Sequence, residues 1–390
     1  MVSTPARPKS FVFLSSNRTP WGGSEELWAG AAIALAEQGH RVSALKGYVD
    51  TKAPRVQRLR ALGRPVRDLS RPVWLPAKVT SFATHVSPHS VHFLYLAAVA
   101  LKLAMSRPDL VIISQGGSHD GQFMASICRR LKKPYVLIAQ KAGYPYWPTD
   151  SSLPSLRASY TKARACYFVS EHNLRLTEEQ FGVALPHARV VRNPFLVPWT
   201  RRHDWPSGDV MRLACVGRLW VMEKGQDLLI RVLARDKWRA RPLSVTIIGE
   251  GPHRAALEAM AAYHQVDRVS FAGFVTDIPA IWNDHHALIA PSRCEGLPLV
   301  LVEAMLSGRV PIATDVAGIA ELLDDGATGF LAAAATEDAL DAALERAWQR
   351  RDEWQAIGAA AAERIRELVP EDPAKDLAAM LLSEASRADA

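Results

Sequence analysis

Short apolar segments alternate with longer amphipathic stretches along most of the 390-residue chain. This pattern is typical of a parallel β-sheet that is covered by helices on both faces. In the first half it predicts strands at residues 11–15, 42–45, 110–114, 135–139, 167–170 and 189–191. Helices are predicted between and after them, at residues 25–38, 92–106, 121–131, 153–163 and 171–181.

The second half repeats the alternation, and the chain is too long for one ordinary core. Strands are predicted at residues 212–216, 244–248, 269–271, 287–290 and 310–313, each with a following helix, and further helices at 336–368 and 374–386. Pro194, Pro198 and Pro206 interrupt any regular element between the halves. We therefore expect a first lobe at 1–195, a linker at 196–210, a second lobe at 211–370 and a C-terminal helix at 371–390.

Two glutamates, Glu295 and Glu303, stand on either side of seven residues in the second half. A turn follows the first of them, and the apolar run 299–306 then predicts a buried helix. Unpaired backbone N–H groups at such a helix terminus can hold an anion, and carboxylates accept hydrogen bonds from vicinal hydroxyls. The stretch therefore favours a polyol phosphate as ligand.

This spacing resembles the signature of the retaining glycosyltransferases of family four, which is glutamate, seven residues, glutamate. Further motifs follow in the order of that family, closely over residues 211–335 and more loosely in the first half. They are Val216-Gly-Arg-Leu219, Lys224-Gly225, Ile248-Gly-Glu-Gly251, Gly273-Phe-Val275, Ala290-Pro-Ser292 and Asp325-Gly-Ala-Thr-Gly329. The resemblance implies an α/β GT-B fold, in which two Rossmann-like, doubly wound parallel-sheet lobes have a cleft between them. The first lobe would bind the acceptor and the second the nucleotide sugar, with the last helix crossing back to the first lobe.

The activity implied by the resemblance is that of a hexosyltransferase. It would move a sugar from a nucleoside diphosphate to a glycan, lipid-linked or small-molecule acceptor, with retention and by same-face attack. Two alternatives stay open: a nucleotide-sugar 2-epimerase of the same fold, and a non-catalytic subunit of a glycan-assembly complex. The sequence names neither the nucleobase, the sugar, the acceptor nor the linkage.

Arg218 and Lys224 lie at the end of the first strand of the second half and in the loop after it. Such cations can offset the charge of a diphosphate, and the resemblance gives both a catalytic role. The alternative for Lys224 is a surface ion pair with Glu223 or Asp227. Because the sequence contains no Asp-x-Asp, we expect no metal, and we expect no cofactor besides the donor substrate.

The resemblance also assigns the donor-binding residues. Glu295, a further catalytic candidate, would accept hydrogen bonds from the donor sugar beside the backbone of Gly296 and Leu297, and Glu303 would hold the ribose hydroxyls. The alternative for either glutamate is a helix cap or an ion pair. Pro298 replaces a glycine that is common in the family and removes one backbone donor. The remaining donor contacts would come from Gly249, Glu250, Gly251, Phe274 and Val275, although the glycine turn alone could be any tight turn.

In the first half, Gly22 and Gly23 follow the first strand and open a helix, for which Ser24 is a candidate N-cap. They match the family's glycine loop, where backbone can approach a phosphate or sugar. A plain strand-to-helix turn would also use two glycines.

Family members commonly carry a histidine after the fourth strand. Here Gln115 stands near that place, with His119 one turn later, and Gln140 stands where a histidine often ends the next strand. His119 is the catalytic candidate, and its alternative is a loop histidine beside Asp120. Asn193 is either a cleft residue or a turn residue.

Charge is distributed unevenly between the halves. Residues 1–200 hold 26 Lys and Arg against 11 Asp and Glu, whereas residues 201–390 hold 21 against 29. Much of the excess lies in the basic segment 52–78, which also contains Trp74. It suits an anionic membrane surface or a phosphorylated acceptor, or else forms a solvated helix and loop. Nucleic acid is not expected as a partner because no recognition motif accompanies the charge.

The apolar stretch at the first strand is shorter than the hydrophobic region of a signal peptide. The apolar stretch at 91–105 is shorter than a membrane-spanning segment. We expect a cytoplasmic protein with peripheral contact at the inner membrane face. The four cysteines are scattered, which favours buried free thiols.

Overall fold

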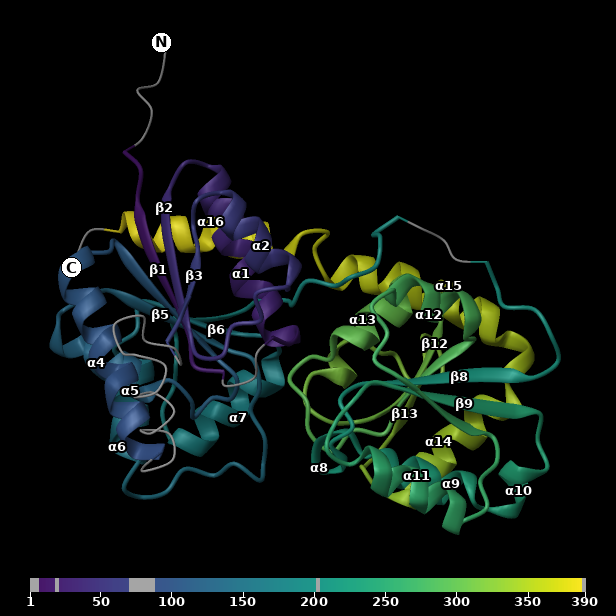
Figure 1. Ribbon diagram of the computed structural model, residues 1–390. Helices are drawn as coiled ribbons and strands as arrows, with labels where there is room; N and C mark the ends of the chain where they lie inside the picture. The colour runs from purple at the N-terminus through teal and green to yellow at the C-terminus, as the bar shows by residue number, and fades with distance from the viewer. Residues whose placement is uncertain (1–6, 18–20, 70–87, 201–203, 388–390) are drawn as a thin grey trace. The chain divides into compact units, whose positions relative to one another are not determined.

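The computed structural model describes residues 7–17, 21–69, 88–200 and 204–387. The chain forms two compact α/β units (Figure 1). Unit 1 comprises Met1–Pro194 and Asp372–Ala390, and unit 2 comprises Phe195–Glu371. In the described residues, no helix has the length and apolar character needed to cross a bilayer.

Unit 1 is built on a seven-stranded parallel sheet in the order β3-β2-β1-β4-β5-β6-β7. β4 and β5 are buried along their whole length, as expected for a parallel sheet with helices on both faces. The strand order reverses between β1 and β4, and doubly wound sheets bind ligands beyond the carboxyl ends of the strands at such a point. The strands are β1 (Ser10–Ser15), β2 (Arg41–Lys46), β3 (Val66–Asp68), β4 (Leu110–Gln115), β5 (Tyr135–Ala139), β6 (Cys166–Phe168) and β7 (Ala188–Val190).

The helices of unit 1 include one from the far end of the chain. They are α1 (Gly23–Glu37), α2 (Pro54–Ala61), α4 (Pro88–Ser106), α5 (Gln122–Arg130), α6 (Leu153–Thr161), α7 (Glu171–Phe181) and α16 (Pro373–Ser386). α16 packs along α1 (Figure 1). Gly30 makes this approach feasible, since a Cβ there would lie 2.5 Å from the Cβ of Ala374. Leu377 and Leu381 of α16 are fully buried in the core that α1 and β1 share.

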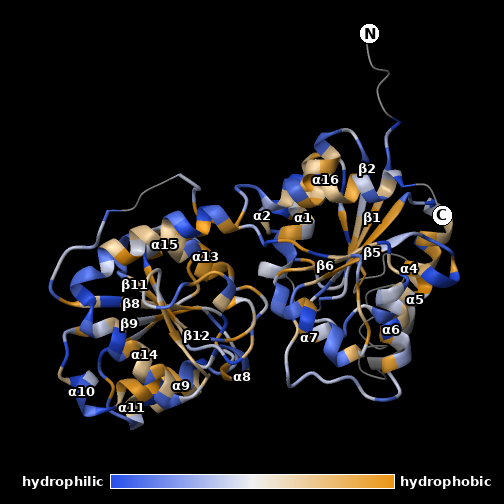
Figure 2. Ribbon diagram, turned by 180° about the vertical axis from the view of Figure 1, so that it is seen from behind, coloured by the Kyte–Doolittle hydropathy of each residue, from blue (hydrophilic) through white to orange (hydrophobic). Residues whose placement is uncertain are grey.

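Unit 2 has a six-stranded parallel sheet in the order β10-β9-β8-β11-β12-β13. Its strands are β8 (Met211–Val216), β9 (Leu243–Ile248), β10 (Val269–Gly273), β11 (Ala287–Ala290), β12 (Val310–Thr314) and β13 (Phe330–Ala332). Its helices are α8 (Val221–Lys224), α9 (Gln226–Leu233), α10 (Asp236–Arg239), α11 (Arg254–Tyr263), α12 (Ile278–Asp284), α13 (Leu299–Leu306), α14 (Glu337–Gln349) and α15 (Trp354–Leu368). Hydrophobic residues gather in the strands at the centre of each unit and on the helices that cover them (Figure 2).

The described residues of the predicted linker are attached to unit 2. The buried Arg309 donates from Nε to the carbonyl of Trp282 and from Nη2 to that of Asp204. His286 lies 3.0 Å from the carbonyl of Pro206 through Nε2, and the Arg309 guanidinium lies over the ring of Trp205. The segment therefore packs as part of this unit's surface.

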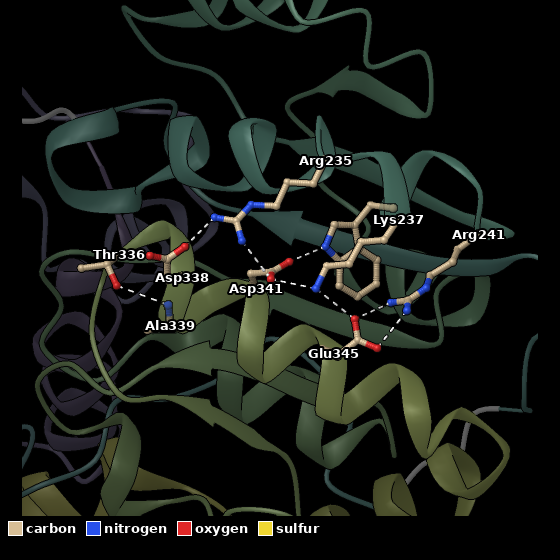
Figure 3. Close-up of polar contacts among 9 residues, drawn as sticks. Arg235, Lys237, Arg241, Thr336, Asp338, Ala339, Asp341 and Glu345 are labelled. Atoms are coloured by element: carbon tan, nitrogen blue, oxygen red, sulfur yellow. Dashed lines mark hydrogen bonds and ion pairs between the residues drawn. The ribbon is translucent and has the colours of Figure 1, made fainter.

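A network of charges joins α10 and its flanks to α14 (Figure 3). Asp341 accepts from Trp238 Nε1 and pairs with Arg235 and Lys237. Glu345 pairs with Lys237 and, through both carboxylate oxygens, with Arg241. Several charges thus act on each carboxylate, which is the arrangement in which surface ion pairs contribute to stability.

The structure confirms the predicted alternation of strands and helices and places the apolar run after Glu295 in α13. The helix predicted directly after the strand at 310–313 was wrong, because the 3₁₀ turn Ile319–Glu321 and β13 follow β12. The helix predicted at 336–368 is divided into α14 and α15 by the 3₁₀ turn Arg351–Glu353. Two short strands, β3 and β13, were not predicted, because three residues are too few to show a period. The N-cap assignment for α1 was wrong. Gly22 is the N-cap in extended conformation, and Ser24 lies inside the helix, where its Oγ accepts from Asn17 Nδ2.

Candidate active site

Lys224 and Glu295, two of the predicted catalytic residues, contact each other in unit 2. Lys224 Nζ lies 2.6 Å from Glu295 Oε1, and both side chains are largely buried. Ser292 Oγ donates to the same oxygen at 2.8 Å. Thr314 Oγ1, at the end of β12, donates to the Ser292 carbonyl. Residues of α8, of the loop after β11 and of the last position of β12 therefore fix one cation and one carboxylate at the carboxyl edge of the sheet.

The loop that carries Lys224 can only be built with glycines. Gly225 has φ +63°, and a Cβ there would lie 1.9 Å from the carbonyl oxygen of Pro291. Gly249 has φ +140°, and its Cβ would lie 2.0 Å from the carbonyl oxygen of Gly217. A Cβ at Gly251 would likewise meet the carbonyl of Leu219. These close approaches bring the loops after β8, β9 and β11 together, and they explain the glycines of the sequence motifs.

Arg218 projects from the end of β8 and is exposed. Its guanidinium lies 5.5 Å from the centre of the Trp220 ring, and this is its one recorded side-chain contact in the described residues. Trp220 stacks on His253 with centroids 4.8 Å apart, and His253 Nδ1 accepts from the backbone N–H of Val221. The Arg218 charge is therefore available to a ligand, while the loop beneath it is held.

Glu303 lies on α13 and is buried, where its Oε1 accepts from the backbone N–H of Leu196. Gly296 and Leu297 are buried in the turn before that helix, and the Gly296 carbonyl accepts from Gly318. Pro298 is the N-cap of α13, so its missing N–H does not interrupt the helix. The roles assigned to these residues stay predictions.

The remaining predicted donor residues lie at the ends of β9 and β10. The Glu250 carbonyl accepts from Leu219, which links this turn to the loop of Arg218. Phe274 and Val275 follow β10, and the Phe274 side chain is 70% exposed. An exposed ring at this edge is free to contact a planar ligand.

Asp227 and Arg293 were not predicted as site residues. Arg293 forms a bidentate pair with Asp227, with N–O distances of 2.6 and 2.8 Å, and also donates to the Val221 carbonyl. The backbone N–H groups of Arg293 and Cys294 donate to the Glu223 carbonyl. Hydrogen bonds from Arg293 and Arg231 hold the pKa of Asp227 below its usual range, although burial opposes this shift. The ion pair between Arg293 and Asp227 therefore joins the segment that carries Lys224 to the loop that carries Glu295.

In unit 1, the predicted glycine loop opens α1. The Gly22 carbonyl accepts from Glu25, whose side chain is fully buried. Glu25 lies 3.5 Å from the buried Lys46, and Lys46 Nζ donates to the Asn17 carbonyl. Burial lowers the pKa of Lys46, and Glu25 opposes the shift. This buried pair fixes the backbone just after β1.

The polar candidates of unit 1 differ in their surroundings. Gln115 is engaged on both sides, since it donates to the Asp120 carbonyl and accepts from Tyr160. Burial lowers the pKa of His119, which packs edge-on against Phe181. Gln140 Nε2 and Asn193 Oδ1 are buried and have no hydrogen-bond partner in the described part of the chain. His119 Nε2 is likewise buried without a hydrogen-bond partner among the described residues, so all three atoms are available to a ligand.

The described residues contain no group of three or more His, Cys, Asp or Glu that could hold a metal ion. All four cysteines are free and buried, as the sequence predicted. Burial raises the pKa of the Cys215 thiol to about 12, against the nearby charge of Lys224.

Two α/β units built on parallel sheets of these strand orders match the GT-B fold of glycosyltransferases. Among solved structures, that of Anabaena HepE in complex with UDP-glucose superposes with a TM-score of 0.76 at 18% identity, covering 96% of this chain and 99% of that one. Residues 211–350 match the family described as glycosyl transferases group 1. The resemblance to family four is consistent with this match.

Curated relatives match part of the chain. The alpha-D-kanosaminyltransferase of Streptomyces kanamyceticus is 35% identical over 119 residues, which are 30% of this chain and 31% of that protein. The GDP-mannose-dependent alpha-(1-6)-phosphatidylinositol monomannoside mannosyltransferase of Mycobacterium tuberculosis is 31% identical over 178 residues, which are 42% of this chain and 45% of that protein. The chain thus spans less than half the length of these two relatives.

Proposed function

We propose that this protein is a retaining hexosyltransferase that moves a sugar from a nucleoside-diphosphate sugar to a glycan, lipid-linked or small-molecule acceptor. The observation that carries the proposal is the 2.6 Å contact between Lys224 and Glu295 at the carboxyl edge of the sheet of unit 2, where glycines allow the loops to approach closely. This edge lies in the part of the chain that matches the group 1 family. The UDP-glucose bound to HepE and the GDP-mannose named for the mycobacterial relative support the class of donor.

The proposed role of the two cations is to stabilise the leaving diphosphate. The Lys224 ammonium has three N–H donors, of which one is directed at Glu295. The others can reach a phosphate oxygen, and Glu295 can at the same time accept from a sugar hydroxyl. Arg218, which has no carboxylate partner recorded in the described residues, would add a planar fork of donors. Charge stabilisation of this kind would make the transfer independent of a metal.

In the proposed step, the bond from the sugar C1 to the leaving phosphate oxygen breaks as the acceptor oxygen approaches the same face. The departing phosphate takes the proton of the acceptor hydroxyl, and the new C1–O bond keeps the configuration of the donor. A two-step route would require a carboxylate against C1, whereas Glu295 is already paired with Lys224.

The test is turnover of a panel of UDP-, GDP- and ADP-sugars in EDTA, with the freed nucleotide and the anomeric form of the sugar as readouts. Turnover of one donor with retention would support the proposal and identify the donor. Loss of activity in EDTA that Mg²⁺ restores would contradict metal independence. An epimerised free sugar would indicate the 2-epimerase, and failure of every nucleotide to bind by calorimetry would leave a non-catalytic subunit.

Peripheral contact with an anionic membrane is part of the same proposal and rests on the basic segment 52–78. Arg55 and Arg58 are ion-paired with Glu26 and Glu37 of α1, so the contact would depend on the other basic residues of the segment. Trp74 and residues 70–78 lie outside the described residues. Salt-sensitive binding to phosphatidylglycerol vesicles would support the contact, and equal binding to phosphatidylcholine vesicles would contradict it.

A further inference from the structure

Three exposed aromatic rings follow β5 in unit 1, in the segment Gly143-Tyr-Pro-Tyr-Trp-Pro148, here called the aromatic loop. Tyr144 is 65% exposed, Tyr146 46% and Trp147 60%. Among the described residues, none of the three belongs to a core cluster of the unit. Their ring contacts are at the surface: Tyr144 meets His172 edge-on with centroids 5.9 Å apart, and Lys141 Nζ lies 5.5 Å from the centre of the Tyr146 ring. Large rings left in solvent cost hydration free energy, so their concentration in four residues requires an explanation outside the folding of the domain.

The base of the aromatic loop is fixed although its rings are exposed. The Lys141 carbonyl accepts from the Ser118 N–H at 2.8 Å, and the Gly143 carbonyl accepts from Gln180 Nε2 at 3.0 Å. The Tyr146 N–H closes a turn onto the same Gly143 carbonyl. Two prolines restrict the backbone further. Rings presented on a rigid base lose little conformational entropy when they bind.

The position of the aromatic loop is that of a ligand-binding loop. It begins beyond the carboxyl end of β5, which pairs with β4 beside the point where the strand order reverses. Two buried polar atoms near its base, Gln140 Nε2 and Ser118 Oγ, have no hydrogen-bond partner in the described residues. Buried polar groups are normally satisfied, so these atoms indicate a polar ligand or ordered water.

We propose that the aromatic loop is a saccharide-binding platform on which Tyr144 and Trp147 stack against the C–H face of an acceptor sugar. The inference rests on the proposed function, because it identifies the acceptor as a saccharide. A pyranose ring presents a flat face of C–H bonds and a rim of hydroxyls. The rings match the face through dispersion and C–H contacts, while the phenol of Tyr144 and the indole N–H of Trp147 can reach the rim.

The charge of the loop argues against a membrane as the partner. Residues 141–152 contain one lysine and one aspartate, so they give no net attraction to anionic lipid. The aromatic loop contains no Leu, Ile, Val, Met or Phe, and aliphatic or Phe side chains would be expected to insert among acyl chains. Rings without aliphatic neighbours fit the face of a sugar better.

The experiment uses the full chain and saturation-transfer-difference NMR with methyl α-D-glucopyranoside, methyl α-D-mannopyranoside and methyl α-D-galactopyranoside. We expect transfer to the ring C–H protons of at least one glycoside. The Tyr144→Ala/Trp147→Ala variant should weaken that binding about fivefold or more, as the loss of stacking worth about 1 kcal/mol predicts. The Tyr144→Phe/Trp147→Phe variant should keep most of the binding because the ring faces remain.

Tyr263→Ala is the matched control, since Tyr263 is 83% exposed at the end of α11 in unit 2. Equal saturation transfer in the wild type and the double alanine variant would overturn the proposal, and so would transfer to none of the three glycosides. Binding to phosphatidylglycerol vesicles that is lost in the alanine variant would assign the loop to a membrane instead. Calorimetry with UDP and GDP on the same samples tests the proposed function separately, because the nucleotide does not depend on this loop.

Discussion

At the scale of single residues, the position of Lys224 depends on contacts from distant parts of the sequence. Ser292 and Thr314 fix Glu295, and Glu295 in turn fixes the ammonium group. The motifs identified Lys224 and Glu295 separately. Their contact could not be predicted, because it depends on how α8, the loop after β11 and the end of β12 meet after the sheet has formed. The alternative of an ion pair between Lys224 and Asp227 is not observed, since Arg293 and Arg231 pair with the Asp227 carboxylate.

Replacement of Lys224 by alanine should lower donor turnover about tenfold or more, which corresponds to about 1.4 kcal/mol of lost transition-state stabilisation. The reason is that one of the two cations proposed to stabilise the leaving phosphate is removed. Steady-state release of the nucleotide from the donor that the panel identifies is the measurement. Lys237→Ala is the control, because this lysine pairs with Asp341 and Glu345 far from the glycine loops in sequence. Equal turnover in Lys224→Ala and wild type would remove Lys224 from the site.

At the scale of elements, two loops of unit 2 support each other beneath Arg218. The Leu219 N–H donates to Glu250, the His253 N–H donates to Leu219, and Trp220 stacks on His253. These contacts between the two loops could not be predicted from the sequence, because they join residues that no motif connects. Trp220, in the loop after β8, contacts both the Arg218 guanidinium and the His253 ring.

Trp220→Ala should therefore lower donor turnover about threefold to tenfold, since the guanidinium loses its ring contact and Arg218 becomes less ordered. Trp220→Phe should retain most of the activity because a ring remains. His253→Asn provides a second comparison, since its side-chain oxygen can still accept from Val221. The kinetics of the three variants are compared at one saturating donor concentration. Equal losses in the alanine and phenylalanine variants would indicate that the stack does not position Arg218.

The network between α10 and α14 predicts how stability depends on pH. Hydrogen bonds from Arg241 chiefly, and from Lys237, lower the pKa of Glu345 from 4.5 to about 2. A carboxyl group with a lowered folded-state pKa stabilises the fold fully above its unfolded pKa and loses this contribution as pH falls toward the folded value. Stability of unit 2 should therefore decline between about pH 4.5 and about pH 2.

Urea unfolding of wild type and Glu345→Gln at a series of pH values measures this contribution. The variant should be less stable at neutral pH, and the difference should shrink as the pH approaches 2. Glu363→Gln is the matched control, since Glu363 is exposed and has no recorded ion pair in the described structure. A difference between Glu345→Gln and wild type that stays constant with pH would show that the ion pairs are not responsible.

At the scale of the whole molecule, the alternation of strands and helices was sufficient to predict two parallel α/β units. Central strands such as β4 and β11 are buried on both faces, so they are continuous apolar runs that stand out from the amphipathic helices. The grouping of residues 372–390 with unit 1 came from the family resemblance, since α16 contacts α1 across more than 300 residues of chain and no local period reports such a contact. The attachment of residues 204–206 to unit 2 was not predicted, because it depends on a buried arginine and a histidine from elsewhere in the sequence.

This connectivity predicts that a change near the C-terminus destabilises the first part of the chain. Leu381 is fully buried against the core of α1 and β1, so Leu381→Ala should cost unit 1 about 2 to 5 kcal/mol. Hydrogen exchange followed by mass spectrometry reports on the two units separately: peptides from β1, β4 and α1 should lose protection, whereas peptides from β8 and β11 should not. Ser383→Ala, at an exposed position of the same helix, is the control. Equal loss of protection in both units would mean that they unfold as one cooperative body and that α16 stabilises the whole chain.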